Sequence, residues 1–424
     1  MSNNPIEQAE QLLKQENYPA AGKLFRQVWE EEENPYAASR YLSCLRKAGY
    51  PGAAIKQGQK AKQQFPEDNY IKNELIWAFY FRDIKNFPEE EHINKLINSA
   101  INILNYQPDK LPKELTVMAV VKLAKQKDEW QTVSEWCDKL EPQMMDNTLI
   151  NGKGKSKQEQ WFFAKVKSLI QLELWKEARS WALKATKFYP RETHFYRWAA
   201  LALKGAGEVE KAIKEFENIM IKHRVEWYLL QDLGDCYYLL NQLDKAISFS
   251  CRAALGSGEY KTKVTLYMNI AKLTLEAGNI EIAVRNIELS KAIRQQEGWK
   301  IKQDLQNLDS EIYQQLEKSR KSVELENYDI KYLIKICEKD WKKMVYSGSP
   351  RKSGIIDYLP PDKAHGFVMS NEGERLFFLQ KDLPPSLRKE KLRVNFSLEK
   401  SWDRKQEKES LKAVNFSRYN SHKP

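Results

Sequence analysis

The feature that most constrains this chain is a small residue that recurs at nearly equal intervals. Six alanines at equivalent positions of the pattern define it: four are 34, 34 and 37 residues apart in the middle of the chain, and two are 33 apart near its start. These anchor residues are Ala21, Ala54, Ala178, Ala212, Ala246 and Ala283. A fixed period of this length is typical of proteins in which one supersecondary unit stacks on the next. Because a small residue midway along a helix lets a neighbouring helix approach closely, the period predicts stacked helix pairs.

The repeated unit resembles the tetratricopeptide repeat (TPR), a helix–turn–helix of 34 residues. In the clearest unit, Leu233, Gly234 and Tyr237 stand at the Leu, Gly and Tyr positions of that family. Elsewhere the signature is degenerate, since Lys165 and Val166 occupy the Leu and Gly positions. The resemblance implies an α-solenoid with an extended concave binding face.

Turns and irregular segments divide this helical region. Gly49, Gly207 and Gly278 stand between the two helices of a pair, where glycine adopts a left-handed backbone without steric cost. Around Trp130 and Val133 the pattern indicates another pair with a larger anchor residue. Fewer than a tenth of the residues are glycine or proline, which favours long helices with short connections.

The solenoid is expected to occupy residues 1–346 in about eight helix pairs. Helical periodicity continues less regularly through 69–142, whereas 142–160 has no periodicity and is expected to form an inserted loop. A long helical segment from about Trp299 to Met344 is polar on one face, as the terminal cap of a solenoid must be.

The concave face is the expected site for a protein or peptide partner. In the repeat frame, the first-helix positions that face it are Arg197, Lys204, Tyr228, Gln231, Asp235, Tyr238, Met268 and Lys272. They do not reproduce the two-lysine, two-asparagine clamp with which some relatives hold peptide C-termini. The alternative is that these side chains only line a solvated surface.

Positive charge is concentrated near the C-terminus. The chain has 69 Lys and Arg against 58 Asp and Glu, a net charge of +11. Residues 341–424 alone contribute +8 of that excess. A local basic excess favours partners that carry phosphate, such as nucleic acid, although a solvated tail would have the same composition.

The helical periodicity of the sequence ends where this basic region begins. Residues 347–351 are turn-prone and basic, and are expected to form a linker. Over 352–419, five short β-prone runs alternate with Pro, Gly, Asn and charged turns, which predicts a small five-stranded barrel of the OB type. Residues 420–424 are expected to be a tail.

Four motifs in this region resemble a cold-shock domain. That family opens with Gly-x-Val-Lys-Trp-Phe, continues with Lys-Gly-Phe-Gly-Phe-Ile and Val-Phe-Val-His, and closes on Ala-x-Asn-Val. The corresponding segments here, in the same order, are Gly354–Leu359, Lys363–Val368, Leu376–Leu379 and Ala413–Phe416. The resemblance covers about 15% of the chain.

The resemblance implies a surface for single-stranded nucleic acid, on which bases stack against aromatic rings. The stacking positions are Tyr358, His365, Phe367 and Phe377, and the neighbouring phosphate contacts are Lys363, Arg375 and Lys381. Phe378 is expected to face the core. The sequence departs from the family at Asp357, Leu359 and Leu379, which replace Lys, Phe and His. These departures imply a smaller and weaker platform, or a barrel whose aromatics are only core.

No motif in the chain supports catalysis or a cofactor. The run GKGKS at 152–156 lacks the earlier glycine of a phosphate-binding loop, because position 149 is leucine. The five histidines lack metal-ligand spacing, and no nucleophile signature occurs. We therefore expect a protein that is not an enzyme and that uses no metal or other cofactor.

Composition favours a cytoplasmic protein. The mean hydropathy is −0.68 and no apolar run approaches the roughly 20 residues that span a bilayer. The start of the chain lacks the plan of a signal peptide. Five scattered cysteines without a Cys-x-x-Cys pair fit a reducing compartment and argue against a disulfide framework.

The leading hypothesis is an adaptor that holds single-stranded RNA or DNA, RNA favoured, on the barrel and a protein partner in the solenoid. The combination resembles architectures found beside nucleic-acid-processing enzymes in bacterial conflict or mobile-element systems. One alternative is a protein–protein scaffold whose barrel no longer binds nucleic acid. A second alternative is a helical sensor that grips nucleic acid in the solenoid groove.

Overall fold

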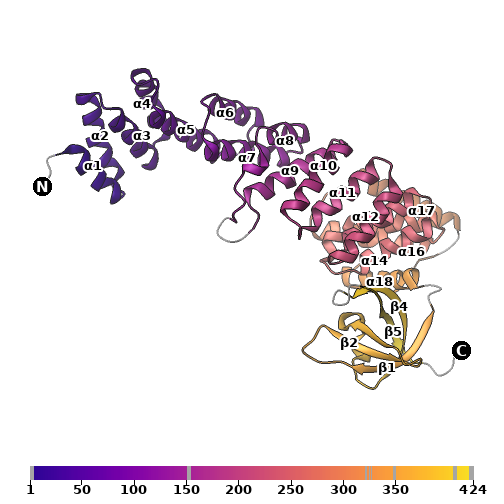
Figure 1. The fold of residues 1–424 in the computed structure, drawn as a ribbon. Coiled ribbons are helices and arrows are strands. Elements are labelled where there is room, and N and C mark those ends of the chain that lie inside the picture. The colour runs from indigo at the N-terminus through magenta and orange to yellow at the C-terminus, as the bar shows by residue number, and fades with distance from the viewer. Residues whose placement is uncertain are drawn as a thin grey trace. The chain divides into compact units, whose positions relative to one another are not determined.

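A computed structural model describes residues 4–149, 154–319, 322–323, 325, 327–346, 350–403 and 408–419. The chain forms two compact units, Met1–Gly205 and Ala206–Pro424. The first unit consists of helices α1–α11, and the second consists of α12–α18 followed by strands β1–β5 (Figure 1). Among the described residues, no helix is both long enough and apolar enough to cross a bilayer.

The first unit is a succession of short antiparallel helices joined by tight turns. Its helices are α1 (Pro5–Lys14), α2 (Tyr18–Glu32), α3 (Pro35–Lys47), α4 (Pro51–Gln64), α5 (Asn69–Phe79), α6 (Ile93–Asn105), α7 (Lys110–Gln126), α8 (Trp130–Cys137), α9 (Lys157–Gln171), α10 (Trp175–Phe188) and α11 (Thr193–Gly205). A π-helical turn, η1 (Tyr80–Ile84), continues α5.

The second unit continues the same pattern. Its helices are α12 (Val209–Lys222), α13 (Trp227–Leu239), α14 (Leu243–Leu255), α15 (Val264–Glu276), α16 (Ile280–Gln296), α17 (Gln303–Ser319) and α18 (Ile330–Tyr346). The protein is therefore mainly helical, as predicted.

Helix starts follow from local capping chemistry. The side chains of Asn4, Asn17 and Asn34 precede α1, α2 and α3 and accept hydrogen bonds from backbone N–H groups two or three residues later, at 3.0, 3.3 and 3.1 Å. Proline follows in the first turn of each helix, where its missing N–H leaves no donor unsatisfied.

The anchor alanines lie where the period predicted them. All six are at most 1% exposed. Five lie on the second helix of a pair within one unit, on α2, α4, α10, α14 and α16, and Ala212 lies on α12. Val133, the predicted larger anchor, is fully buried on α8. The structure therefore confirms helix pairs that pack through small residues.

The turns between paired helices share one backbone conformation. Gly49, Gly207 and Gly278 have φ of +88°, +82° and +74°, which confirms the left-handed turn predicted there. Glu173 and Asn241 adopt the same region at φ of 57°, although neither is glycine. The turn geometry is therefore a property of the repeat, and glycine is only its least strained occupant.

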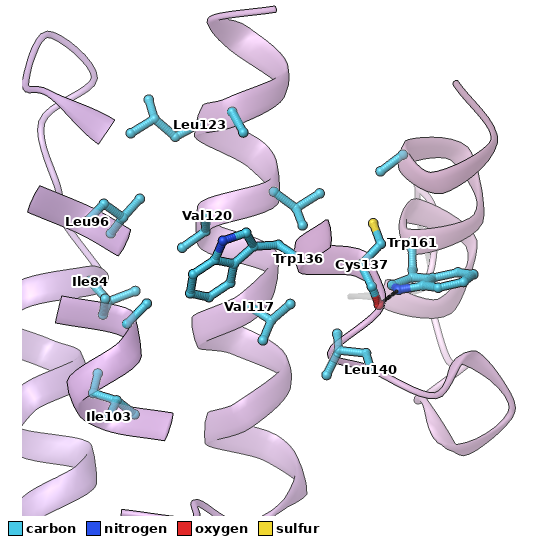
Figure 2. Close-up of a cluster of buried hydrophobic side chains, with 14 of the residues drawn as sticks. Ile84, Leu96, Ile103, Val117, Val120, Leu123, Trp136, Cys137, Leu140 and Trp161 are labelled. Atoms are coloured by element: carbon cyan, nitrogen blue, oxygen red, sulfur yellow. Dashed lines mark hydrogen bonds between the residues drawn. The ribbon is translucent and has the colours of Figure 1, made fainter. Parts of the chain in front are cut away.

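The first unit has a continuous core through the less regular region 69–142. Figure 2 shows Ile84, Leu96, Ile103, Val120 and Trp136 gathered between neighbouring helices, and all are buried. In the same core the Trp161 indole donates a 2.9 Å hydrogen bond to the carbonyl oxygen of Cys137. This bond ties α9 to the end of α8. Between them, residues 142–149 and 154–156 form a connection that contains a single 3-10 turn, Pro142–Met144. The remainder of the predicted loop, 150–153, lies outside the described residues.

The helical segment predicted from about Trp299 to Met344 contains two helices. α17 ends at Ser319, and α18 starts only at Ile330. The Asp329 carboxylate accepts hydrogen bonds from the backbone N–H of Lys331, at 2.8 Å, and of Tyr332. A side chain that caps a helix in this way begins a new helix. The helical segment is therefore interrupted here, although the apolar residues keep helical spacing on both sides.

Five strands follow α18. They are β1 (Arg351–Tyr358), β2 (His365–Ser370), β3 (Arg375–Leu379), β4 (Arg393–Asp403) and β5 (Lys408–Arg418). They pair in the order β1-β2-β3-β5-β4, and β1 also pairs with β4, so the pairing returns to its first strand. The structure thus confirms a five-stranded sheet. The predicted linker positions 347–349 and the tail 420–424 lie outside the described residues.

The sheet has its own core, which side-chain alternation creates. Ile356, Val368 and Phe378 point inward from β1, β2 and β3 and are fully buried, as are Val394 and Phe396 on β4. The burial of Phe378 confirms the inward orientation predicted for it. Intervening residues on β1–β3 face the opposite side, which is where the candidate site lies.

Candidate nucleic-acid interface

Strand register brings the four predicted stacking residues to one face of the sheet. Tyr358 on β1 is paired with Phe367 on β2, and Phe367 is paired with Phe377 on β3. His365 lies two residues before Phe367 and therefore on the same side of the strand. All four side chains are partly exposed. The structure therefore brings these four aromatic residues together on one face.

The rings form one contiguous cluster. The ring centroids of His365 and Phe377 are 5.6 Å apart with an interplanar angle of 28°, a stacked arrangement. Phe367 lies 6.2 Å from Tyr358, 6.0 Å from His365 and 6.1 Å from Phe377, with its plane tilted or perpendicular to theirs. Since Phe367 contacts the other three, it is the centre of the cluster.

Two glycines allow the strands beneath this face to come close. A Cβ at Gly366 would lie 2.5 Å from Cζ of Phe378 and 2.6 Å from the carbonyl oxygen of Tyr358. A Cβ at Gly354 would lie 2.3 Å from the carbonyl oxygen of Met369. No side chain larger than hydrogen fits at either position without moving backbone, so both glycines belong to the framework of the aromatic cluster.

The three predicted cations have different surroundings. The Lys363 ammonium lies 3.3 Å from the Tyr358 hydroxyl oxygen, at the edge of the cluster. Arg375 forms an ion pair with Asp357, with 2.8 Å between Nε and Oδ2, and its guanidinium lies 4.4 Å from the centre of the Phe367 ring. Lys381 instead donates a 2.9 Å hydrogen bond to the hydroxyl of Ser257, beyond the sheet.

The residues that depart from the family pattern have definite positions. Asp357 faces outward beside the cluster and engages Arg375. Leu379 is paired with His365 across β2 and β3, so an aliphatic side chain stands at that end of the cluster. Leu359 packs against the sheet core.

A second group of charges joins the sheet to the helices of its own unit. Glu399 on β4 lies 3.3 Å from Arg252 of α14 and 2.7 Å from Lys412 of β5, and all three side chains are at least two-thirds buried. Nearby, burial raises the pKa of Asp382, although Lys412 and Lys381 act in the opposite direction. Sequence reasoning missed this group, because no local pattern links residues about 150 positions apart.

The predicted partner-groove residues fall in both units. Arg197 and Lys204 lie on α11, in the first unit, and the other six lie on α13 and α15, in the second. Tyr238 and Lys272 come together with Glu276, since the Tyr238 hydroxyl donates to the Glu276 carboxylate at 2.9 Å.

Lys272 also lies 5.1 Å from the centre of the Tyr238 ring. Met268 packs against the buried cluster of α15–α17, which gives it a structural role. Tyr228, Gln231 and Asp235 lie on the first helix of their pair and are half-buried.

Neither a disulfide nor a metal cluster occurs in the described part of the chain. The five cysteines are buried thiols outside any disulfide. Within the described ranges, no three His, Cys, Asp or Glu side chains gather as a metal site would require. The start of the predicted basic run at 152–156 lies outside these ranges, whereas Ser156 caps α9 by accepting from the Glu159 N–H at 3.1 Å.

Residues 193–329, less than half of the chain, match a family model described as a domain of unknown function (DUF7017). The curated proteins contain no match to this sequence.

Several solved structures are similar at a low level. A tetratricopeptide repeat protein from Parabacteroides merdae is 12% identical with a TM-score of 0.31, over 64% of this chain and 97% of that one. YrrB, described as a TPR protein with an unusual peptide-binding site, is 12% identical with a TM-score of 0.28, over 54% and 89%. IFIT1 with Gppp-AAAA is 12% identical with a TM-score of 0.39, over 79% and 78%. Likeness at this level supports no conclusion about what this chain binds.

Proposed function

We propose that this chain is a non-enzymatic adaptor that couples single-stranded nucleic acid, RNA favoured, to a protein partner. In this proposal the five-stranded sheet is a cold-shock-like OB barrel that binds the nucleic acid, and the helical repeats bind the protein. The observation that carries the proposal is the cluster of Tyr358, His365, Phe367 and Phe377, four partly exposed rings in contact on one sheet face.

Unpaired bases are the ligands that suit such a face. Every base has a flat π surface, and stacking on an aromatic side chain is worth about 1–3 kcal/mol per base whatever the sequence. Lys363 at the edge of the cluster supplies a cation for the backbone. A base-paired duplex hides its π surfaces within its own stack, so the cluster favours single strands.

The helical repeats are proposed to hold a protein or peptide. Tyr238, Lys272 and Glu276 together present an aromatic ring, a cation and a carboxylate on the first helices of neighbouring pairs. Such a mixed surface suits a polar peptide backbone better than a purely apolar segment.

The test is fluorescence anisotropy with the full-length chain and labelled single-stranded RNA and DNA at two salt concentrations. Phe367→Ala and Phe377→Ala should each weaken binding by roughly 5- to 150-fold, the equivalent of one lost stacking contact. Phe188→Ala removes a half-exposed ring from α10 and is the matched control, expected to leave affinity unchanged. Unchanged binding by both sheet variants would place the nucleic-acid site in the helices.

A protein scaffold without nucleic-acid binding is the second candidate function. Two contacts favour it: Glu399 of β4 with Arg252 of α14, and Lys381, just after β3, with Ser257 in the bend that follows α14. In that case the sheet completes the helical stack. The wild-type chain would then bind neither RNA nor DNA, and Glu399→Lys would raise hydrogen exchange in both α14 and β4.

A further inference from the structure

An ion pair spans the centre of the aromatic cluster. Asp357 lies on β1 and Arg375 lies on β3, with β2 and its Phe367 between them. The Arg375 Nε is 2.8 Å from the Asp357 carboxylate, and the guanidinium lies 4.4 Å from the Phe367 ring centre. The pair therefore covers one face of the ring that contacts all the others.

A local irregularity in β1 gives Asp357 this position. The pairing of β1 with β2 shifts register between Ile356 and Tyr358, so Asp357 is an extra residue without its own partner on β2. Ile356 is buried, whereas Asp357 and Tyr358 both face outward. A bulge of this kind redirects a side chain, and here it adds a carboxylate to an otherwise aromatic face.

We propose that Asp357 sets which ligands the cluster accepts, by holding Arg375 over Phe367. This inference rests on the function proposed above. The Asp357 charge neutralises the cation nearest the rings and repels phosphate, so a bare polyanion gains little on this face. A nucleobase gains more, because it can replace the guanidinium on the ring.

The pair is able to open for such a ligand. The Arg375 side chain is 51% exposed and that of Asp357 is 38% exposed, so water screens their attraction. A base that stacks on Phe367 displaces the guanidinium sideways while Asp357 can still hold it. Under this arrangement Arg375 is not a phosphate contact, contrary to the role that the family resemblance implies.

The experiment compares two ligands on the full-length chain: labelled oligothymidylate and an abasic DNA strand of the same length. Asp357→Asn should tighten binding of the abasic strand by roughly three- to tenfold and steepen the salt dependence by about one phosphate contact. Asp362→Asn is the matched control, since it removes the same charge from an exposed position in the turn before β2. It should change affinity by less than about twofold.

Arg375 separates this inference from a general charge effect. Arg375→Ala in the wild-type background should leave the salt dependence of oligothymidylate binding unchanged, and in Asp357→Asn it should abolish the gain. If oligothymidylate binds but Asp357→Asn and Asp362→Asn behave alike, this inference fails and the proposed function stands.

The inference also fails, and the proposed function stands, if Arg375→Ala in the wild-type background makes the salt dependence of oligothymidylate binding shallower. If neither the wild type nor Asp357→Asn binds oligothymidylate, both fail. Binding of oligothymidylate by Asp357→Asn but not by the wild type would also overturn the inference, because the ion pair would then exclude bases as well as bare polyanions.

Discussion

The backbone at Gly366 lies so close to Phe378 and to the carbonyl oxygen of Tyr358 that the cost of a side chain there can be predicted. Gly366→Ala would place a Cβ 2.5 Å from Phe378 and 2.6 Å from the Tyr358 carbonyl oxygen, well inside ordinary contact. Phe378 is fully buried and the carbonyl is part of β1, so relief requires β1 and β2 to separate. Overpacking of this kind typically costs about 1–3 kcal/mol. The locally opened population of the sheet should therefore rise roughly 5- to 150-fold.

Hydrogen exchange on the full-length chain measures this effect directly. Amide exchange in β1 and β2 reports the free energy of local opening, and should accelerate by that factor in Gly366→Ala. Gly52→Ala is the control, because a Cβ there meets nothing within 4 Å and the site is on α4. Unchanged protection of β1 and β2 would refute the reasoning, since it would mean that the strands accommodate a methyl group at no cost.

Three further predictions concern the helical part. Burial lowers the pKa of Lys263 to about 8, below the ordinary value of about 10.4, so folding disfavours its charged form. Wild-type stability should consequently rise by about 1–3 kcal/mol from pH 8 to about 10.5 relative to Lys263→Met, in urea unfolding at several pH values. Asn286→Leu removes the 2.9 Å acceptor of the buried Trp341 N–H and should lower stability by about 1–3 kcal/mol in thermal unfolding. Glu173→Gly relieves a left-handed residue and should raise stability by about 0.5–1 kcal/mol in the same assay; a decrease would contradict the strain argument.

The helical fold was largely predictable because its strongest signal is local and repeated. A small residue such as Ala212 must recur wherever helices pack closely, so the period reveals the pairs. The signal fails where a single side chain decides the structure. The Asp329 cap ends the apparent continuity of the last helical segment, and the π-helical turn Tyr80–Ile84 has no counterpart in the repeat.

The placement of the aromatic residues in the candidate site could be predicted from the sequence, whereas the partners of its charged residues could not. Alternation along β2 fixes His365 and Phe367 to one side, and Phe377 follows from the motif order. The partners of charged side chains depend on register and bulges. The ion pair between Asp357 and Arg375 needs both strands and a bulge in β1, and the contact of Lys381 with Ser257 joins residues 124 positions apart.

The buried cysteines have a consequence for measuring how this chain opens. One thiol lies on each of α3, α8, α13, α14 and α18: Cys44, Cys137, Cys236, Cys251 and Cys337. Burial raises the pKa of Cys44 to about 11 and that of Cys137 further, so these thiols stay protonated and unreactive while their helices are closed. Cys44 and Cys137 lie in two different core clusters, and Cys251 and Cys337 share a third, so local opening of one cluster exposes only the thiols of that cluster. A thiol-modifying reagent applied to the unmodified chain would therefore report the opening of the helices through these five cysteines. The sheet contains no cysteine, so its opening would not be detected by that reagent.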